Sequence, residues 1–311
     1  MGLRDMALTI YKELQSWLIP RLLLAAESDW AKCPPSHPSR FLARGLIGAP
    51  IARALLANGA NVVVIVRPGF RQRLALPPEI PLHELECSEY EALKQLLAAN
   101  RVQVVISTIS AADVAAQHIL ATTAQEAGVQ LFVPSEFGIV TDSVPDFAAV
   151  IEHLKSRNFP YTRFYVGFFI ETIPAMMGLT VNSKINVVGF GNMPCSFTSS
   201  EDVAGFVAHV LTTVPPESLA NKTFRLEGDR STLSDLAILF DTELNFVEKV
   251  PGRMGDLWTK MQKAAECGMA STGWDVAGCG EGREECAGCT NSLWEGHEWM
   301  KIVTFFKRQN S

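Results

Sequence analysis

The stretch that decides the fold is Leu131-Phe132-Val133-Pro134-Ser135-Glu136-Phe137-Gly138, hereafter the octet 131–138. Its first three residues predict a short apolar strand, which runs directly into a proline and a polar turn. In an open α/β sheet, ligands bind in the crevice beyond the carboxyl ends of the strands. A strand that ends in this way therefore places a hydroxyl, a carboxylate and an aromatic ring at the expected ligand-binding edge.

Apolar strands alternate with helical patterns on both sides of the octet, from residue 45 to about residue 165. The predicted strands are 62–66, 82–87, 102–106 and 131–133, and the predicted helices are 45–57, 89–99 and 111–127. The 62–66 run is continuously apolar, as expected for a strand that is buried on both faces. This order predicts βαβ units and an α/β fold with a Rossmann-like, doubly wound parallel sheet.

A partial glycine-rich turn opens the helix predicted over 45–57. Dinucleotide sites place a strand, a glycine-rich turn and a helix in succession, and the helix N-terminus receives the pyrophosphate. Gly45-Leu46-Ile47-Gly48 supplies the last two glycines of a G-x-x-G-x-x-G pattern, but the first position is Leu42. Prolines 34, 35 and 38 exclude an ordinary central strand before it. Either the N-terminus is altered and lacks the first strand, or 40–44 forms a degenerate one.

Arg67 follows the strand predicted over 62–66, where NAD enzymes place an acidic residue and an arginine suits the 2′-phosphate of NADP. Its guanidinium can donate two charge-assisted hydrogen bonds to phosphate, although a solvated surface arginine is the alternative. Ser107 and Thr108 leave the next strand where the nucleotide would pass. We therefore expect NADP(H), bound by Gly45, Leu46, Ile47, Gly48, Arg67, Ser107, Thr108, Pro134, Ser135, Glu136 and Phe137.

The octet, together with Phe159-Pro160-Tyr161-Thr162 and Val166-Gly167-Phe168-Phe169, resembles signatures of the isoflavone reductase-like and NmrA-like proteins. These are atypical short-chain dehydrogenase relatives, and the similarity covers about residues 45–300. The resemblance implies NADP(H)-dependent hydride transfer to a small aromatic or other secondary-metabolite substrate. It also implies that 135–137 border the nicotinamide and that Val166, Gly167, Phe168 and Phe169 meet the substrate.

The same resemblance implies a catalytic lysine on the helix after the octet. Counting back from Pro160 leads instead to Phe147, which cannot donate a proton. Lys155, the nearest lysine, is expected in solvent, and Glu152 and His153 are the neighbouring titratable residues. The Tyr-x-x-x-Lys spacing of Tyr90 and Lys94 falls far from the expected place and is read as chance. No catalytic residue is therefore assigned.

Composition narrows the class of protein. The 311 residues are 48% hydrophobic and 19% charged, which suits a buried core and argues against disorder. The net charge of −6 provides no general attraction for nucleic acid or anionic membranes. An apolar stretch at 17–26 is too short to span a bilayer, and Pro20 and Arg21 interrupt it. We expect a soluble, cytoplasmic protein.

Seven cysteines, an odd number, favour a reducing compartment. Cys286-Ala-Gly-Cys289 is a single Cys-x-x-Cys, with Cys267, Cys279 and His297 around it. A zinc ribbon needs a second pair, and a redox motif needs a thioredoxin-like setting. No metal is predicted, and the tryptophans of this region are expected to pack the tail onto the core.

Beyond residue 165 the alternation loosens, with predicted strands at 184–188 and 222–226 and helices at 200–212 and 233–244. Ser199 or Ser200 is the expected N-cap of the 200–212 helix. We expect an atypical N-terminal extension over 1–40, an NAD(P)-binding domain over 41–165, and a substrate lobe over 166–311 that is interwoven with it.

Three functions remain open at this point. The first is an NADPH-dependent oxidoreductase, which the Val166–Phe169 loop favours. The second is a non-catalytic, NmrA-like NAD(P) sensor that regulates a protein partner, which Phe147 at the lysine position favours. The third is an inactive chain whose altered N-terminus has removed nucleotide affinity.

Overall fold

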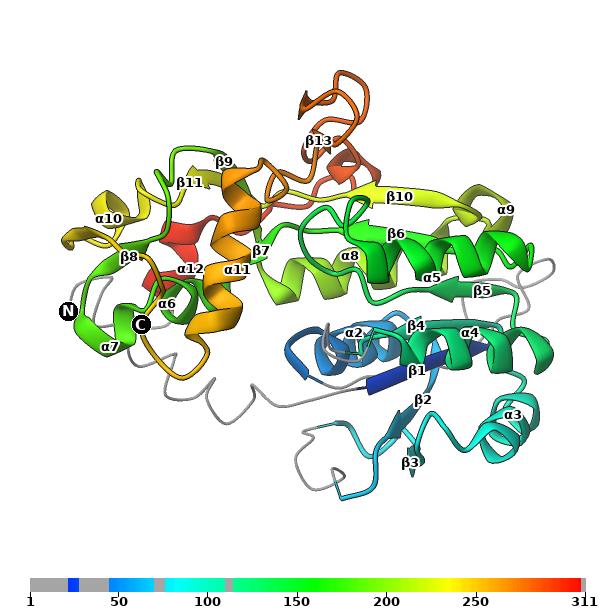
Figure 1. The fold of residues 1–311 in the computed structure, drawn as a ribbon. Coiled ribbons are helices and arrows are strands. Elements are labelled where there is room, and N and C mark those ends of the chain that lie inside the picture. Colours follow the sequence, from blue (N-terminus) through cyan, green and yellow to red (C-terminus); the bar gives the residue numbers. More distant parts are fainter. Residues whose placement is uncertain (1–21, 28–44, 70–75, 110–113, 309–311) are drawn as a thin grey trace.

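A five-stranded sheet forms the centre of the computed structural model, which describes residues 22–27, 45–69, 76–109 and 114–308 (Figure 1). The strand order is β3-β2-β1-β4-β5. The strands are β1 (Leu22–Glu27), β2 (Asn61–Val66), β3 (Leu82–Glu84), β4 (Val104–Ser107) and β5 (Leu131–Val133). β2 pairs with β3, and β4 with β5, in parallel.

The central strand departs from the expected all-parallel sheet, because β1 pairs antiparallel with both β2 and β4. The N–H and C=O groups of β2 and β4 need a strand between them, and the sequence before α2 carries prolines 34, 35 and 38, which lack the N–H that a central strand donates. The apolar run upstream of these prolines fills the place, since an antiparallel ladder pairs these backbone groups as well as a parallel one does. The alternative strand at 40–44 lies outside the described residues.

Two further strands extend the sheet at its β5 edge. β6 (Thr162–Tyr165) pairs in parallel with β10 (Lys222–Arg225), and backbone bridges Phe132↔Tyr161 and Gly138↔Tyr165 place β6 beside β5. The carboxyl ends of β2, β4, β5, β6 and β10 therefore share one edge, hereafter the carboxyl edge.

Helices cover both faces of the sheet (Figure 1). α2 (Gly45–Ala57) packs on α8 (Ser200–Thr213), and α4 (Ala116–Glu126) contacts both α3 (Tyr90–Ala99) and α5 (Pro145–Ser156). α4 ends where Gly128 adopts a φ of +87°, which confirms the predicted stop. Ser199 is the N-cap of α8, because its Oγ accepts a hydrogen bond from the Asp202 N–H at 3.0 Å.

The remaining elements build a second lobe around a separate apolar core. β9 (Pro194–Thr198) pairs with β7 (Phe168–Phe169) and β11 (Asp229–Thr232), β8 (Ile185–Val187) with β12 (Leu244–Phe246), and β13 (Trp274–Asp275) with β14 (Gly280–Glu281). The helices are η3 (Ile170–Thr172), α6 (Ile173–Met176), α7 (Leu179–Asn182), α9 (Pro216–Leu219), α10 (Leu236–Leu239), α11 (Gly255–Glu266), η4 (Asn291–Leu293) and α12 (Ile302–Arg308).

The prediction of a helix over 233–244 was wrong in its extent. Only α10 forms there, because Asp241 adopts a φ of +47° and the Thr242 N–H bonds the Ala237 carbonyl, which closes the helix. The chain then continues as β12.

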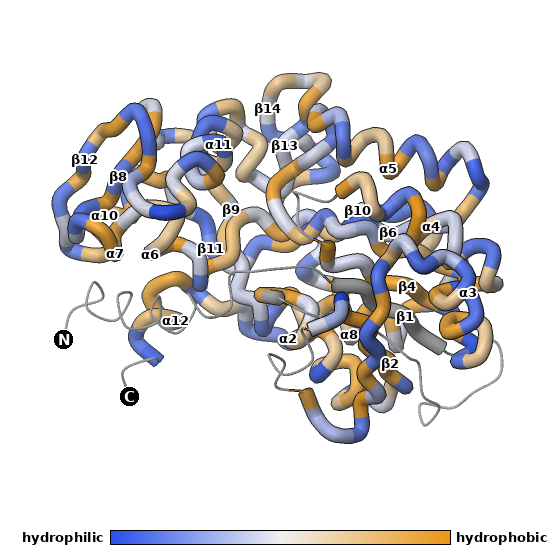
Figure 2. The backbone as a smooth tube through the Cα atoms, turned by 60° about the horizontal axis from the view of Figure 1, so that its bottom comes forward, coloured by the Kyte–Doolittle hydropathy of each residue, from blue (hydrophilic) through white to orange (hydrophobic). Residues whose placement is uncertain are grey.

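The two hydrophobic cores cross the expected domain boundary at residue 165. The first combines β2, β4 and β5 with α2 and α4, and it also takes in α8 and Phe224 of β10. The second holds β8, β9, α6 and α12. β4 is predominantly hydrophobic in Figure 2, as expected for a strand covered on both faces.

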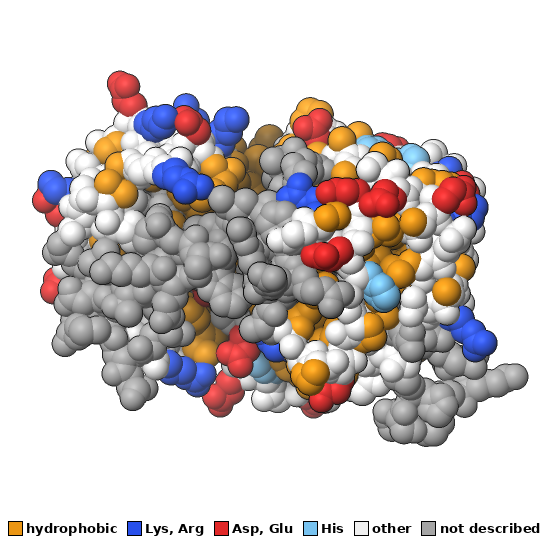
Figure 3. Space-filling model, turned by 90° about the horizontal axis from the view of Figure 1, so that it is seen from below, with side chains coloured by type: hydrophobic (Ala, Val, Ile, Leu, Met, Phe, Trp, Pro, Cys, Tyr) orange, Lys and Arg blue, Asp and Glu red, His pale blue; other side chains and the backbone are white. Residues whose placement is uncertain are grey.

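The surface of the described residues is mixed in charge on the face shown in Figure 3, where acidic and basic side chains are interspersed. Among the described helices, none combines the length and hydrophobicity that a bilayer crossing requires.

Candidate functional site

α2 begins at the carboxyl edge, next to the end of β2. The turn after α2 contains Gly59 at a φ of +80° and leads directly into β2. Since 13 helical residues and six strand residues both span about 20 Å, Gly45 and Arg67 lie at the same end of this unit. Of the predicted turn, Ile47 and Gly48 are buried, Leu46 is half-buried, and Leu42 lies outside the described residues.

The ends of β4 and β5 bring Ser107, Thr108 and Ser135 to this edge. The Ser135 N–H donates to Gln117 Oε1 at 2.7 Å, and its hydroxyl donates to the Ile109 carbonyl at 2.7 Å. Ser107 is fully buried, and its hydroxyl has no hydrogen-bond partner in the described part of the chain. A buried hydroxyl without a partner is unusual and indicates that a polar group from outside the protein can bind there.

The octet is tied to the Val166–Phe169 loop through its last residue. The Gly138 carbonyl accepts hydrogen bonds from the N–H groups of Val166 at 2.9 Å and Gly167 at 3.0 Å. Gly167 has a φ of +69°, and a Cβ at this position would lie 2.1 Å from the Ser196 carbonyl oxygen. Only glycine therefore fits where the loop crosses β9.

Three of the four predicted substrate residues are buried. Phe168 is 3% exposed, and its ring centroid lies 5.8 Å from that of Phe197 in the core of the lobe. Of the four, only Phe169 keeps appreciable exposed surface. The substrate role of this loop stays a prediction, with Phe169 as its most accessible member.

Glu136 lies in a buried polar cluster that it forms with Arg163, Asp142 and Tyr165. The Glu136 side chain is 1% exposed, and Arg163 Nη1 lies 3.5 Å from its Oε2. Neither carboxyl oxygen has a hydrogen-bond partner in the described structure. Burial raises the pKa of Glu136 to about 7, and the Arg163 charge opposes this shift. Phe137 stacks on Phe164 with centroids 5.8 Å apart.

The other members of this cluster reach toward the surface. Arg163 Nη1 donates to Asp142 Oδ1 at 2.8 Å, and the Tyr165 hydroxyl donates to the same oxygen at 3.0 Å. Burial raises the pKa of the Tyr165 hydroxyl. Sequence reasoning missed these three residues. An arginine in the middle of the buried strand 162–165 was the available signal, because a buried charge requires a partner.

The α5 helix has no proton donor at the expected lysine position. Phe147 lies in its first half, is partly buried, and packs against the first core. Lys155 is 53% exposed and pairs with Glu152 at 2.7 Å, which confirms that it lies in solvent. His153 Nε2 lies 3.0 Å from Thr122 Oγ1 of α4. Since α5 runs away from the carboxyl edge, its last turn lies at the opposite end of the sheet.

Tyr90 and Lys94 form a surface contact between α3 and α4. The Tyr90 hydroxyl donates to Glu126, and Lys94 Nζ pairs with the same carboxylate at 2.8 Å. The Tyr-x-x-x-Lys spacing therefore serves helix packing here.

The C-terminal tail is held by Asp202 of α8. Its Oδ1 lies 2.9 Å from His297 Nε2, and its Oδ2 accepts a hydrogen bond from the Met300 N–H at 2.8 Å. Trp294 and Trp299 pack against the first core, as predicted for the tryptophans of the tail. In the described residues, no group of three or more His, Cys, Asp or Glu side chains is arranged to hold a metal ion.

The fold and this edge define a Rossmann-like α/β protein. The NmrA-like family profile matches residues 41–250, which is more than half of the sequence. The chain therefore belongs to the NmrA-like family.

Proteins of similar sequence include plant reductases. The chain is 30% identical over 165 residues to a probable pinoresinol-lariciresinol reductase of Arabidopsis thaliana, which covers 47% of this chain and 53% of the relative. It is 26% identical over 234 residues to a phenylcoumaran benzylic ether reductase of Ginkgo biloba, with coverages of 67% and 75%. The chain thus spans about half the length of the first relative and three quarters of the second.

Solved structures confirm the Rossmann-like fold. The complex of leucoanthocyanidin reductase from Vitis vinifera with NADPH superposes with a TM-score of 0.66 at 18% identity, over 85% of this chain and 96% of that one. An isoflavone reductase superposes with a TM-score of 0.64 at 17% identity, with the same coverages.

Proposed function

We propose that this protein binds NADP(H) and uses it to reduce a small aromatic substrate. The observation that carries the proposal is the pair of hydrogen bonds from Val166 and Gly167 to the Gly138 carbonyl. They hold the octet, at the expected cofactor edge, against the loop expected to meet the substrate. A structural neighbour was solved with NADP+ and (+)-pinoresinol, and another with NADPH.

The residues at the carboxyl edge fit the cofactor. The first N–H groups of α2 have no intrahelical partners, and in this proposal they receive the pyrophosphate. In this proposal Arg67 binds the 2′-phosphate, and the Ser107 hydroxyl, which has no partner among the described residues, binds a polar group of the nucleotide. When bound, NADPH supplies the hydride.

The protein's own residues then have two tasks: to orient the substrate and to exclude water. Phe169 offers an apolar surface beside the octet, and the buried Val166 and Phe168 keep this side of the loop dry. Gly167 allows the loop to approach β9 closely. Phe147 cannot protonate the product, so in this proposal the proton that completes the reduction is given by a group of the substrate itself or, after release, by water.

The second candidate is a non-catalytic NADP(H) sensor that regulates a partner protein. One observation favours it: Phe147 packs against the core at the position where the resemblance implies a lysine. Such a protein needs the nucleotide site but no proton donor.

Calorimetric titration with NADPH and NADH tests the shared part of both candidates. NADPH should bind more tightly than NADH, and Arg67→Ala should reduce this preference by about tenfold or more, as for loss of a charge-assisted phosphate contact. Arg253→Ala, at an exposed arginine of the lobe, is the matched control. Failure of both nucleotides to bind would refute both candidates.

A turnover assay then separates them. NADPH oxidation is followed with pinoresinol and a panel of smaller phenolic compounds. Turnover of any of these supports the reductase, whereas tight NADPH binding with no turnover across the panel supports the sensor.

A further inference from the structure

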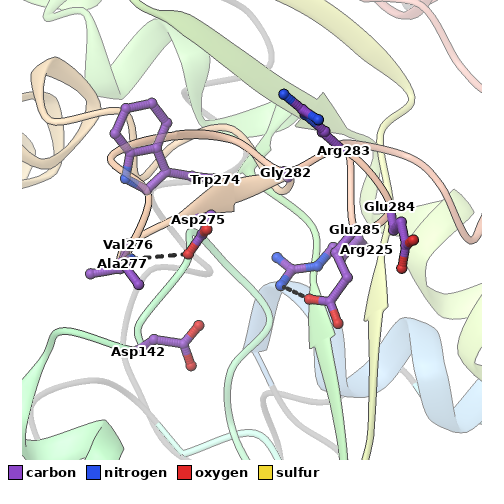
Figure 4. A pocket seen from close by; sticks show the side chains of 11 residues that line it. Asp142, Arg225, Trp274, Asp275, Val276, Ala277, Gly282, Arg283, Glu284 and Glu285 are labelled. Carbon is purple, nitrogen blue, oxygen red and sulfur yellow. Dashed lines mark hydrogen bonds and ion pairs between the residues drawn. The ribbon is translucent and has the colours of Figure 1, made fainter.

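A cavity of about 530 Å³ borders Asp142, a member of the buried polar cluster (Figure 4). Asp142 lines it from the loop after β5, and Arg225 from the end of β10. The β13–β14 hairpin and the segment that follows it form the other side of the cavity. Asp275, Glu284 and Glu285 line it there. Cavities of this size suit small metabolites.

Arg225 is the buried charged group of this cavity, at 7% exposure. Its Nη1 donates to the Thr272 carbonyl at 2.6 Å, and its Nη2 to Glu285 Oε2 at 2.6 Å. Its Nε has no partner in the described structure. In Figure 4 the guanidinium points from β10 into the space between Asp142 and the 274–277 turn.

The buried Nε–H of Arg225 lacks an acceptor, and a carboxylate that also bonds Nη2 would supply one. Nε and Nη2 form one edge of the guanidinium fork, which a carboxylate binds through two parallel hydrogen bonds. Glu285 uses only one of these positions. Because its side chain is 74% exposed, it can move into water and make way for a ligand at small cost.

The other side chains that line the cavity disfavour a ligand that carries only a negative charge. The carboxylates of Asp142, Asp275 and Glu284 line the cavity, although Asp142 is already paired with Arg163, and Arg283 is the only other cationic side chain in the lining. A ligand with a negative charge alone would be repelled by these carboxylates, and a purely cationic ligand would leave Nε unpaired. A ligand that carries both charges satisfies both sets of groups.

We infer that this cavity binds an amino-acid zwitterion. The ligand carboxylate takes the Nε–Nη2 edge of Arg225 and displaces Glu285, and the ammonium group lies on the side of Asp142 and Asp275. Val276 and Ala277 of the turn provide an apolar wall for the side chain. This site does not depend on the proposed reductase activity or on a bound nucleotide.

Calorimetry with three compounds of one carbon skeleton tests the inference. L-Leucine carries both charges, 3-methylbutylamine lacks the carboxylate, and 4-methylpentanoate lacks the ammonium group. We expect leucine to bind, and each single-charge compound to bind about tenfold more weakly or worse. Equal or tighter binding of either single-charge compound would overturn the inference.

Two surface variants locate the site without disturbing the buried arginine. Glu285→Gln removes the competing carboxylate, so leucine should bind several-fold more tightly. Asp275→Asn keeps the hydrogen bond to the Ala277 N–H but loses the charge, so leucine should bind about tenfold more weakly. Glu243→Gln, in the exposed pair with Lys184, is the matched control and should change nothing.

If neither the wild type nor Glu285→Gln gives any heat of leucine binding, the inference is also overturned. Both variants are exposed positions outside the cores, so loss of folding does not confuse the result.

Discussion

Replacing Glu136 by glutamine should change how the stability of this protein depends on pH. The side chain is 1% exposed, and burial raises the pKa of its carboxyl group from 4.5 to about 7. Ionisation therefore costs more in the folded protein than in the unfolded chain. The Arg163 guanidinium at 3.5 Å offsets only part of this cost.

The sign follows from proton linkage. Below pH 4.5 the carboxyl group is protonated in both states, and its contribution is fully present. Between 4.5 and about 7 only the folded protein holds the proton, so the free energy of unfolding falls as the pH rises. The difference between the two pKa values corresponds to about 3 kcal/mol of folding stability, and this contribution is lost above pH 7.

The assay is urea unfolding of the wild type and Glu136→Gln at several pH values from 4.5 to 8. Taking the difference in unfolding free energy between the two proteins at each pH removes the contribution of the other titrating groups. The glutamine variant should gain up to about 3 kcal/mol relative to the wild type across this range, because it cannot ionise. Glu152→Gln, at an exposed residue of α5, should show no such trend. A difference that is constant with pH would refute the reasoning.

Three further positions test the packing of the loop after β6, the start of α8 and the attachment of the C-terminal tail. Gly167→Ala should lower the free energy of unfolding by at least about 2 kcal/mol in urea, because the added Cβ would meet a backbone oxygen. Gly296 also has a left-handed backbone but has open space around it, so Gly296→Ala is the control. An equal loss of stability in both variants would contradict this reasoning. Ser199→Ala should lower stability by about 1 kcal/mol through loss of the α8 cap, whereas Ser199→Asp should retain it; equal losses would contradict the capping role. Asp202→Ala should speed hydrogen exchange at the Met300 N–H and cost about 1–3 kcal/mol, and unchanged exchange would show that the tail is held elsewhere.

Several features of the fold could be predicted from local sequence. The continuous apolar run at 62–66 and the octet predicted β2, β5 and the edge where they end, because strand periodicity and breakers act within a few residues. The sequence also predicted Lys155 in solvent, since it lies two helical turns beyond the expected lysine position. It also showed that Phe147 cannot replace a lysine.

Tertiary structure decided the rest, because it depends on which segments meet. The pairing of Leu22–Glu27 between β2 and β4, and its antiparallel direction, depends on backbone groups that lie far apart in sequence. Local periodicity carries no information about a strand's partner. Likewise, the sequence by itself determined that a carboxylate follows β5. Only the packing of β6 against that loop decided that Glu136 is buried beside Arg163, where its protonation is coupled to folding.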